Sequence, residues 1–462
     1  MLDINREHPE YKLRRTMLRR YRDLYAGGET LQNNASEYLL PRQKEPVEIY
    51  SERLQKVFYE NYIGSIVDWY SATLFRREPV ITIDGPNTTG REFFSTLIDD
   101  CDLKGANFSD LLRRMFVEGV VQGASYLLVD FPRSTVRVGS RAEEDKLGVS
   151  RAYMVSYAAD DLINWSHDER GSFEWVVLRT QRLKKDRVED EEWRKETRWT
   201  YYDKREFRVY ARTESNGVHG EIELVDSGTH GLAELNRVPL FKLEIPEGLW
   251  LLNKAGSLQL EHFNKSNALS WALEMGLFAM PVVYSDRKWN QMIGESYFIQ
   301  LGPNDKFGWT EPEGKVYVIA AENLVRLQEE IYRVCYLPQL GRPMGKGGAQ
   351  SGMSKLREFS ITQEVLRAYG DTVKDLARRV LKAIAAARKD DLAIDVSGMD
   401  EFDIGDYGVE LLNAQNLLAF NIESPTLIKQ VQKKLALKYL CDVRQEVKDS
   451  IAAEIDAAGT KT

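Results

Sequence analysis

The spacing of apolar side chains changes along this sequence from helical to alternating and back again. Alternation holds between Ser125 and Ile245 and is typical of β-strands with one buried face. The alternating segments are SYLLVDF, RAYMVSY, FEWVVLRTQ, REFRVYAR, GEIELVD and VPLFKLEI, separated by charged or glycine-containing turns. We therefore predict an antiparallel sheet region, with the charged stretch from Lys184 to Lys195 as a hairpin in solvent.

Helical spacing precedes the sheet region. A basic amphipathic helix is predicted from Asn5 to Ala26, before Gly27-Gly28, with an apolar stripe of Leu13, Met17, Tyr21 and Leu24. Such a helix either packs by its stripe and faces water with its arginines, or contacts DNA, and the first reading is favoured because charge runs usually face water. Further helices are predicted from Pro46 to about Phe75 and from Arg91 to Gly123, the latter interrupted near Gly105.

Long helices follow the sheet region. One is predicted from Leu251 to Met280, then a strand-turn-strand unit of YFIQLG and KFGWTEP, then a helix from Ala321 to Tyr336. The segment LGRPMGKGGAQSGMS, residues 340–354, holds five glycines and is expected to be a mobile loop. A long helix from Lys355 to Lys389, the strand-like LAIDVSG and helical segments from Val409 to Ile455 complete an α+β fold.

Composition limits the possible functions. The chain has 462 residues, with 63 Lys and Arg against 71 Asp and Glu and a formal charge of -8, so any DNA contact must be local or fleeting. Cys101, Cys335 and Cys441 form neither a metal-binding spacing nor a disulfide framework, which favours a reducing compartment. The charged N-terminus is unlike a signal peptide. The apolar stretch Ala268 to Tyr284 contains Glu274 and is shorter than the roughly 20 residues of a membrane span, so we expect no membrane insertion.

Catalytic motifs are absent from the sequence. The segment GGAQSGMS resembles a phosphate-binding loop but has Met353 where the lysine is required. The sequence has no GxSxG and no HExxH motif. Paired acids such as Asp99-Asp100 and Asp160-Asp161 are expected at helix ends or turns, although a metal-dependent nuclease built from them stays open. We therefore expect no enzyme, no cofactor and no metal site.

Four segments, in this order along the chain, resemble the portal proteins of tailed bacteriophages. They are residues 34–85, which begin NASEYLLPRQKEPVEIYSERLQKVFYENYIGSIVDWYSATLFRREPVITIDG, YAADDLINW at 157–165, SKLREFSITQEVLRAYGDTVKDLARRVLKAI after the glycine-rich loop, and SPTLIKQVQKKL at 424–435. The resemblance implies a portal fold with a mixed α/β wing, long stem helices, a small β-containing clip and a helical crown. By position, the wing would be residues 1–246, stem helix 1 247–280, the clip 281–319, stem helix 2 320–338, the tunnel loop 339–354, a long kinked helix and return to the wing 355–408, and the crown 409–462.

The resemblance also implies a function and a set of partners. Portal proteins form rings, dodecameric in virions, at a capsid vertex through which double-stranded DNA is packaged and ejected. The implied partners are other copies of the chain, terminase, the major capsid protein, head-completion and tail adaptor proteins, and DNA bound without sequence preference. The implied location is the virion, after assembly in the host cytoplasm.

Two groups of site residues follow from the resemblance. Arg342, Lys346, Lys355 and Arg357 in and after the tunnel loop would touch DNA phosphates singly, and the alternative is ordinary solvated charge. The clip residues expected to pack against neighbouring subunits and to dock partners are Tyr297, Phe298, Ile299, Phe307 and Trp309. Another head-tail connector or scaffold-type ring protein, and less so a terminase-like motor or nuclease, are the alternative functions.

Overall fold

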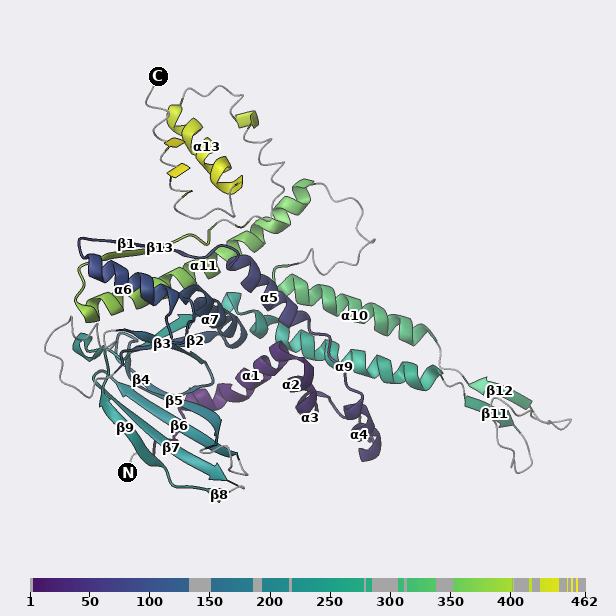
Figure 1. Cartoon of the computed structure of the whole chain (residues 1–462). Helices are drawn as coiled ribbons and strands as arrows, with labels where there is room; N and C mark the ends of the chain where they lie inside the picture. Colours follow the sequence, from purple (N-terminus) through teal and green to yellow (C-terminus); the bar gives the residue numbers. More distant parts are fainter. Residues whose placement is uncertain are drawn as a thin grey trace. The chain divides into compact units, whose positions relative to one another are not determined.

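The chain divides into two compact units, Met1–Asp400 and Glu401–Thr462 (Figure 1). The computed structural model describes residues 3–132, 151–185, 193–215, 218–277, 280–284, 306–310, 314–337, 352–400, 402, 415–417, 424–439, 447, 450–451 and 454–455. The described residues form helices and antiparallel strands in one chain, which confirms the α+β prediction.

Helix α1, Pro9–Ala26, begins with proline in its first turn and ends at Gly27, where the backbone φ is 57°. The residues that it buries differ in part from the predicted apolar stripe. Tyr11, Leu18, Tyr21 and Leu24 are buried, whereas Leu13 is 83% exposed. The predicted stripe counted Leu13 as apolar by type, but Tyr11 covers the sheet side of this helix by packing with Ile163 and Trp199.

The helix predicted from Pro46 to about Phe75 is two helices. After α2, Gly28–Asn33, and α3, Ala35–Tyr38, helix α4 runs over Val47–Gln55 and helix α5 over Tyr62–Leu74. The break has a physical cause at each side. The side chain of Asn267 hydrogen-bonds to both the backbone N–H and the backbone carbonyl of Phe58. Asn61 caps α5 by accepting a hydrogen bond from the N–H of Gly64. These alternative partners replace the helical hydrogen bonds between the two helices.

Helices α6, Thr88–Asp99, and α7, Phe108–Gln122, confirm the predicted pair with an interruption near Gly105. Asn87 and Asn107 cap them by accepting backbone N–H bonds. Helix α7 ends at Gly123, where φ is 85° and where a Cβ atom would lie 3.0 Å from the Trp250 ring. A side chain at this position would therefore strain both the backbone and the ring contact.

The sheet region is antiparallel as predicted, but it forms two sheets. Strand β2, Ala124–Asp130, is buried along its length between β3, Tyr153–Ala158, and β10, Leu240–Glu244. The second sheet follows the order β4, Leu162–His167, β5, Phe173–Lys184, β6, Arg194–Asp203, β7, Glu206–Ser215, and β8, Val218–His219, with β9, Glu223–Thr229, also paired to β7. The prediction missed β4, β6 and the two-residue strand β8.

Strand β6 escaped prediction because a charged residue occupies one of its buried positions. Glu196 is buried, and its carboxylate accepts hydrogen bonds from Arg182 and Arg198 at 2.9 and 2.6 Å. These bonds hold the pKa of Glu196 below its ordinary value although burial alone would raise it. A carboxylate paired with arginines thus occupies an inward position, where the alternating pattern of a strand predicts an apolar side chain.

A third sheet and a long helix also belong to the Met1–Asp400 unit. Strand β1, Val80–Asp84, pairs with β13, Ala393–Ser397, which confirms LAIDVSG as a strand. Helix α11, Gly352–Arg388, confirms the predicted long helix. Short 3-10 helices, Ala233–Leu235 and Glu247–Leu249, flank β10. The ring of Tyr369 on α11 packs edge-on against Tyr70 of α5 and Phe116 of α7, so these three helices share one core.

Two long helices form a hairpin with a small β unit at its far end (Figure 1). Helix α9 spans Leu251–Leu277, strand β11 Met280–Tyr284, strand β12 Lys306–Thr310 and helix α10 Gly314–Val334. We call α9 and α10 together the α9–α10 hairpin. No helix in the described residues is long and apolar enough to cross a membrane.

Two helix boundaries predicted for this hairpin are wrong. Helix α9 ends at Leu277, because the apolar stretch up to Tyr284 changes to a β-branched strand. That strand, β11, pairs with β12, with Pro281 opposite Trp309 and Val283 opposite Phe307, and YFIQLG, the predicted partner of KFGWTEP, lies outside the described residues. Helix α10 starts at Gly314, so residues 314–319, which the prediction gave to the clip, are helical.

In the second unit, helix α13 spans Pro425–Tyr439. Proline stands at its first position, and the hydroxyl of Ser424 accepts from the N–H of Leu427 at 3.4 Å. The helix predicted after Pro425 is therefore confirmed over this range.

Candidate assembly surface

The inner end of the α9–α10 hairpin is fixed in the core. Phe263 of α9 and Leu327 and Ile331 of α10 are buried. The hydroxyl of Tyr70 donates to the carbonyl of Cys335, directly after α10, at 2.8 Å, and the indole N–H of Trp250 donates to the carbonyl of Val121 at 3.0 Å. The hairpin therefore leaves the core in one direction, set by α5 and α7.

Three side-chain amides on α9 bind the N-terminal segment through its backbone. Asn264 accepts from the N–H of Leu40 and donates to the carbonyl of Tyr38, at 2.8 and 3.1 Å. Asn267 accepts from the N–H of Phe58 and donates to its carbonyl, at 3.1 and 2.9 Å. Gln259 donates to the carbonyl of Glu60 at 2.8 Å and accepts from the N–H of Ile63 at 3.4 Å.

These amides were not predicted as functional residues. Their signal in the sequence is an Asn or Gln at positions 259, 264 and 267, on one side of the predicted helix. Because each amide both donates and accepts, it satisfies backbone groups that would otherwise lie unpaired where the chain is neither helix nor strand. Segment 38–63 is thus held along α9 without a sheet.

The outer half of the hairpin exposes apolar side chains. On α10, Val316 is 66%, Val318 59% and Ile319 65% exposed. Leu273 of α9 and Val325 of α10 are also exposed. β-Branched residues are poor helix formers, and helix stability gives no reason to place them in water. A cluster of this kind on a projecting element marks a surface that binds another protein.

The arginines of α1 are largely paired within the chain. Arg15 binds Glu7 at 2.9 Å, Arg19 binds Glu37 at 3.0 Å and Arg22 binds Asp160 at 2.6 Å. The guanidinium of Arg14 lies over the Trp250 ring, 5.6 Å from its centre. These contacts give the basic residues a structural role. They agree with the prediction that α1 packs on the core by its apolar stripe.

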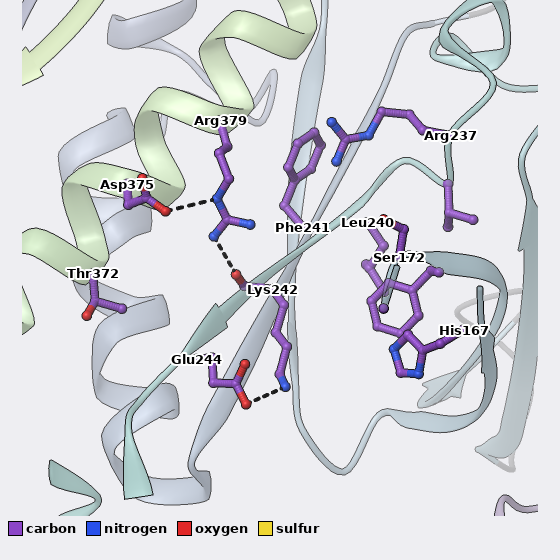
Figure 2. Close-up of a pocket in the computed structure, with 13 residues that line it drawn as sticks. His167, Ser172, Arg237, Leu240, Phe241, Lys242, Glu244, Thr372, Asp375 and Arg379 are labelled. Atoms are coloured by element: carbon purple, nitrogen blue, oxygen red, sulfur yellow. Dashed lines mark hydrogen bonds and ion pairs between the residues drawn. The ribbon is translucent and has the colours of Figure 1, made fainter. Parts of the chain in front are cut away.

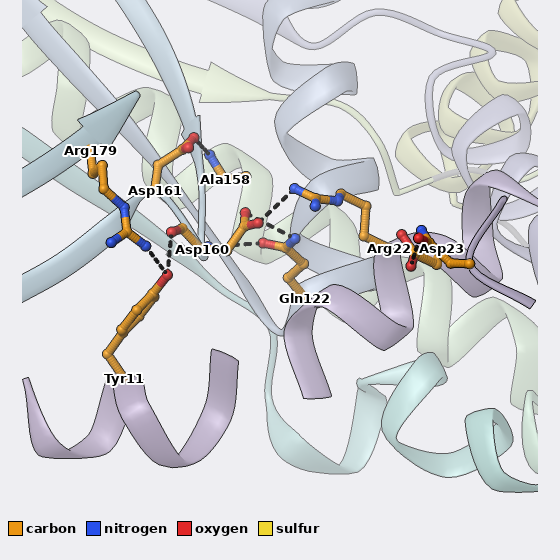
Figure 3. Close-up of polar contacts among 9 residues, drawn as sticks. Tyr11, Arg22, Asp23, Gln122, Ala158, Asp160, Asp161 and Arg179 are labelled. Atoms are coloured by element: carbon orange, nitrogen blue, oxygen red, sulfur yellow. Dashed lines mark hydrogen bonds and ion pairs between the residues drawn. The ribbon is translucent and has the colours of Figure 1, made fainter. Parts of the chain in front are cut away.

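Asp160 and Asp161 lie in the turn between β3 and β4, as expected for paired acids (Figure 3). Asp160 accepts from Arg22 and from Gln122 of α7, and its carbonyl accepts from the hydroxyl of Tyr11. Asp161 accepts from the N–H of Ala158 at 2.9 Å. The turn therefore joins α1, α7 and the sheets.

Burial raises the pKa of Asp161 to about 6, and the neighbouring charge of Asp160 adds to this effect. Burial likewise raises the pKa of Glu118 on α7. Asp161 in the turn and Glu118 on α7 therefore retain their protons more strongly than free carboxyl groups. The hydrogen bond of Asp161 is to the protein backbone, which indicates an architectural role for this carboxyl group.

A cleft of about 690 Å³ lies between the β4–β5 turn, β10 and α11 (Figure 2). Of its cations, Arg237 lies over the Phe241 ring, 4.3 Å from its centre, whereas Lys242 and Arg379 are paired with acidic side chains. Arg379 pairs with Asp375 at 3.3 Å and donates to the carbonyl of Lys242 at 2.9 Å, and Lys242 pairs with Glu244 at 2.8 Å. Since these charges are already compensated, they bind phosphate less readily than free cations do.

Most of the predicted site residues lie outside the described structure. Tyr297, Phe298, Ile299, Arg342 and Lys346 belong to stretches that the structure does not describe. Lys355 and Arg357 lie near the start of α11, and Phe307 and Trp309 lie on β12, but the described structure stops at their backbone. Their roles stay predictions.

No family model matches this sequence, and no curated protein matches it. Among solved structures, the chain is similar to a chain of the virion of a native gene transfer agent particle, with 12% identity, a TM-score of 0.44, and coverage of 85% of this chain and 94% of that chain. It is also similar to a chain in the neck of an empty gene transfer agent particle, with 13% identity, a TM-score of 0.40, and coverage of 78% and 85%. Scores of this size do not establish a common fold.

Proposed function

We propose that this chain is the portal protein of a tailed bacteriophage, a ring subunit at the capsid vertex through which DNA is packaged and ejected. The observation that carries the proposal is the α9–α10 hairpin. It leaves an α/β wing, has a two-stranded unit at its far end, and exposes Val316, Val318 and Ile319 on its outer half (Figure 1). In this proposal α9 and α10 are the stem helices and β11 and β12 belong to the clip.

Ring assembly gives the exposed apolar residues a partner. A closed ring forms through heterologous contacts, in which two different faces of each subunit meet. The outer half of the hairpin supplies an apolar face for this purpose. Terminase and later the head-completion and tail adaptors would dock at the clip, and the wing would face the major capsid protein.

The charge of the chain suits a channel through which DNA slides. A formal charge of -8 on every subunit repels a duplex, so DNA is not held tightly along the wall. Contact with phosphates is assigned to a few cations of the tunnel loop, Arg342 and Lys346, with Lys355 and Arg357 behind it. The proposal includes no catalysis, cofactor or metal.

Mass photometry and negative-stain microscopy of the purified chain test the proposal. Closed rings with a central channel are expected, and class averages would count the subunits. Only monomers or two-fold dimers, over a range of concentrations, would contradict it. Procapsids assembled with the chain should also take up DNA when terminase and ATP are added, whereas a ring that binds only filled heads would indicate a connector. The chain alone should hydrolyse no ATP.

Replacing Arg342 and Lys346 with Gln tests the tunnel loop. Rings should form as in wild type, because the proposal places neither side chain in a core. DNA retention in filled heads should change, and its dependence on salt should weaken, because phosphate contacts release counterions. Retention identical to wild type at every salt concentration would show that these two cations are ordinary solvated charges.

A further inference from the structure

Arg237 is a cation without an acidic partner in the cleft of about 690 Å³ between the β4–β5 turn, β10 and α11 (Figure 2). Within the described residues its guanidinium forms no hydrogen bond and no ion pair. The guanidinium lies over the Phe241 ring, 4.3 Å from its centre. The ring covers one face of the guanidinium, so the five N–H donors in its plane stay available to a ligand.

The surroundings of Arg237 leave its charge uncompensated. Partial burial lowers the pKa of Arg237, and the positive charge of Arg379 lowers it further. Glu234, the acid nearest to it in sequence, is paired with Lys389 at 2.8 Å. Because arginine stays protonated near neutral pH, the cleft holds a positive charge that burial and Arg379 both destabilise. An anion bound at Arg237 removes this destabilisation.

The acidic side chains that line the cleft have cations of their own. Arg379 pairs with Asp375 at 3.3 Å, and Lys242 pairs with Glu244 at 2.8 Å. Neither carboxylate forms an ion pair with Arg237. The two acids therefore balance two of the three basic side chains in the lining, and the positive charge that is left over is at Arg237.

The backbone holds Arg237 in a defined position. The 3-10 helix before it ends at Asn236, whose φ of 50° is a left-handed conformation that asparagine tolerates. Val238, directly after it, is buried, and so is Phe241, on which its guanidinium lies. Because buried neighbours and a ring contact fix both ends of this side chain, little conformational entropy remains to be lost when a ligand binds.

Arg379 supplies further donors to the same cleft. Its Nε pairs with Asp375, and one of its Nη atoms donates to the carbonyl of Lys242 at 2.9 Å. Within the described residues the other Nη forms no hydrogen bond. Figure 2 shows Arg379, on α11, and Arg237, just before β10, on two sides of Phe241. Donors that approach from two elements suit the tetrahedral oxygens of a phosphate group better than the two oxygens of a planar carboxylate.

We propose that this cleft binds a phosphate group, with the edge of Arg237 as its main contact and Arg379 as the second. A phosphate accepts two parallel hydrogen bonds from a guanidinium and brings the negative charge that the cleft lacks. The cleft volume lies in the range of about 300–1,000 Å³ that is typical of small-molecule sites. The ligand is inorganic phosphate or the phosphate group of a small molecule. Since the residues that line the cleft lie outside the α9–α10 hairpin, the proposal is independent of ring assembly.

Labelling with phenylglyoxal, which reacts with arginine, tests the site at the level of one side chain. The purified chain is labelled at increasing inorganic phosphate and constant ionic strength, and the labelled arginines are identified by mass spectrometry. Labelling of Arg237 should slow about tenfold at a phosphate concentration about ten times the Kd, because the unbound fraction falls by that factor.

Arg91 is the matched control for the labelling. It is exposed on α6, outside the cleft, and forms no ion pair within the described residues. Its labelling rate should not depend on phosphate. Arg237 labelling that is equally fast with and without phosphate would overturn the proposal, and this result needs no variant and therefore does not depend on the folding of one.

Calorimetric titration with inorganic phosphate measures the affinity. Arg237→Gln should weaken binding by about tenfold or more, as expected when hydrogen bonds to a charged group are lost, and Arg91→Gln should leave it unchanged. A nucleoside monophosphate that binds more tightly than inorganic phosphate would identify the ligand as a phosphorylated small molecule, and equal affinity would identify it as the free ion. Acetate that protects Arg237 as well as phosphate does, or protection by duplex DNA alone, would overturn the phosphate site.

Discussion

The inner and outer halves of the α9–α10 hairpin are built on different principles. The inner half, residues 251–267 and 327–334, buries Phe263, Leu327 and Ile331 and uses amides to bind backbone of the N-terminal segment. The outer half, residues 268–277 and 314–326, exposes valine and isoleucine. The inner half therefore belongs to the fold of one chain, and the proposal assigns the outer half to contact between chains.

The largest effect on folding is expected in the inner half. Phe263→Ala removes a ring that is 1% exposed and should lower the free energy of unfolding by about 3 to 5 kcal/mol, because a buried cavity remains. Chemical denaturation measures this. The matched control, Leu273→Ala in the outer half, should change stability little. Equal losses in the two variants would contradict the division of the hairpin.

The second largest loss of stability is expected on replacing one of the amides of α9. Asn267→Leu leaves the N–H and carbonyl of Phe58 without their partner and should destabilise by about 2 to 4 kcal/mol, since each unsatisfied buried group costs about 1 to 3 kcal/mol. Ser257→Leu, at an exposed position of the same helix, is the control. A neutral result for Asn267→Leu would mean that water replaces the amide and that segment 38–63 is held by other contacts.

The turn between β3 and β4 differs from α9 in the kind of polar group that it buries. The turn buries a carboxyl group, whereas α9 buries neutral amides. Asp161 has a pKa of about 6 in the folded chain against 3.8 for a free side chain. The folded state therefore keeps a proton that the unfolded state releases, so this group makes the free energy of unfolding fall as pH rises from 3.8 to about 6. The loss is at most about 3 kcal/mol.

Asp161→Asn should remove this contribution and keep the acceptor for the N–H of Ala158. The variant should be more stable than wild type at pH 7, and the difference should shrink toward pH 4. Denaturation curves at a series of pH values measure it, with the exposed Asp226→Asn as control. A difference that does not vary with pH would show that Asp161 titrates as an ordinary carboxyl group.

The sheet region and the α9–α10 hairpin also differ in how far the sequence predicts them. Alternation identified β2, β5, β7 and β10, because apolar residues fill their inward positions. It missed β6, because a glutamate, Glu196, occupies an inward position there and the pattern of apolar residues does not show that Arg182 and Arg198 neutralise it. It also merged α4 with α5, because the amide of Asn267 that separates them comes from a helix more than 200 residues later. Long-range polar partners leave no periodic signal.

The candidate surface was predictable only in part. The sequence indicated two long helices with a β unit between them, and both helices are present. It began the second of these helices at Ala321 and placed Val316, Val318 and Ile319 in the clip, whereas they form the exposed start of α10. The pairing of β11 with β12 was not predicted, because β11 lies at the end of an apolar stretch that begins in a helix and was predicted as helical.

The central claim is that the outer half of the hairpin assembles the ring and contributes little to the fold. The most direct measurement is the combined stability and mass of a variant carrying Val318→Asp and Ile319→Asp. Its free energy of unfolding should stay within about 0.5 kcal/mol of wild type, as for exposed positions. Mass photometry should show monomers at concentrations where wild type forms closed rings. Rings of wild-type abundance from a folded variant would contradict the account.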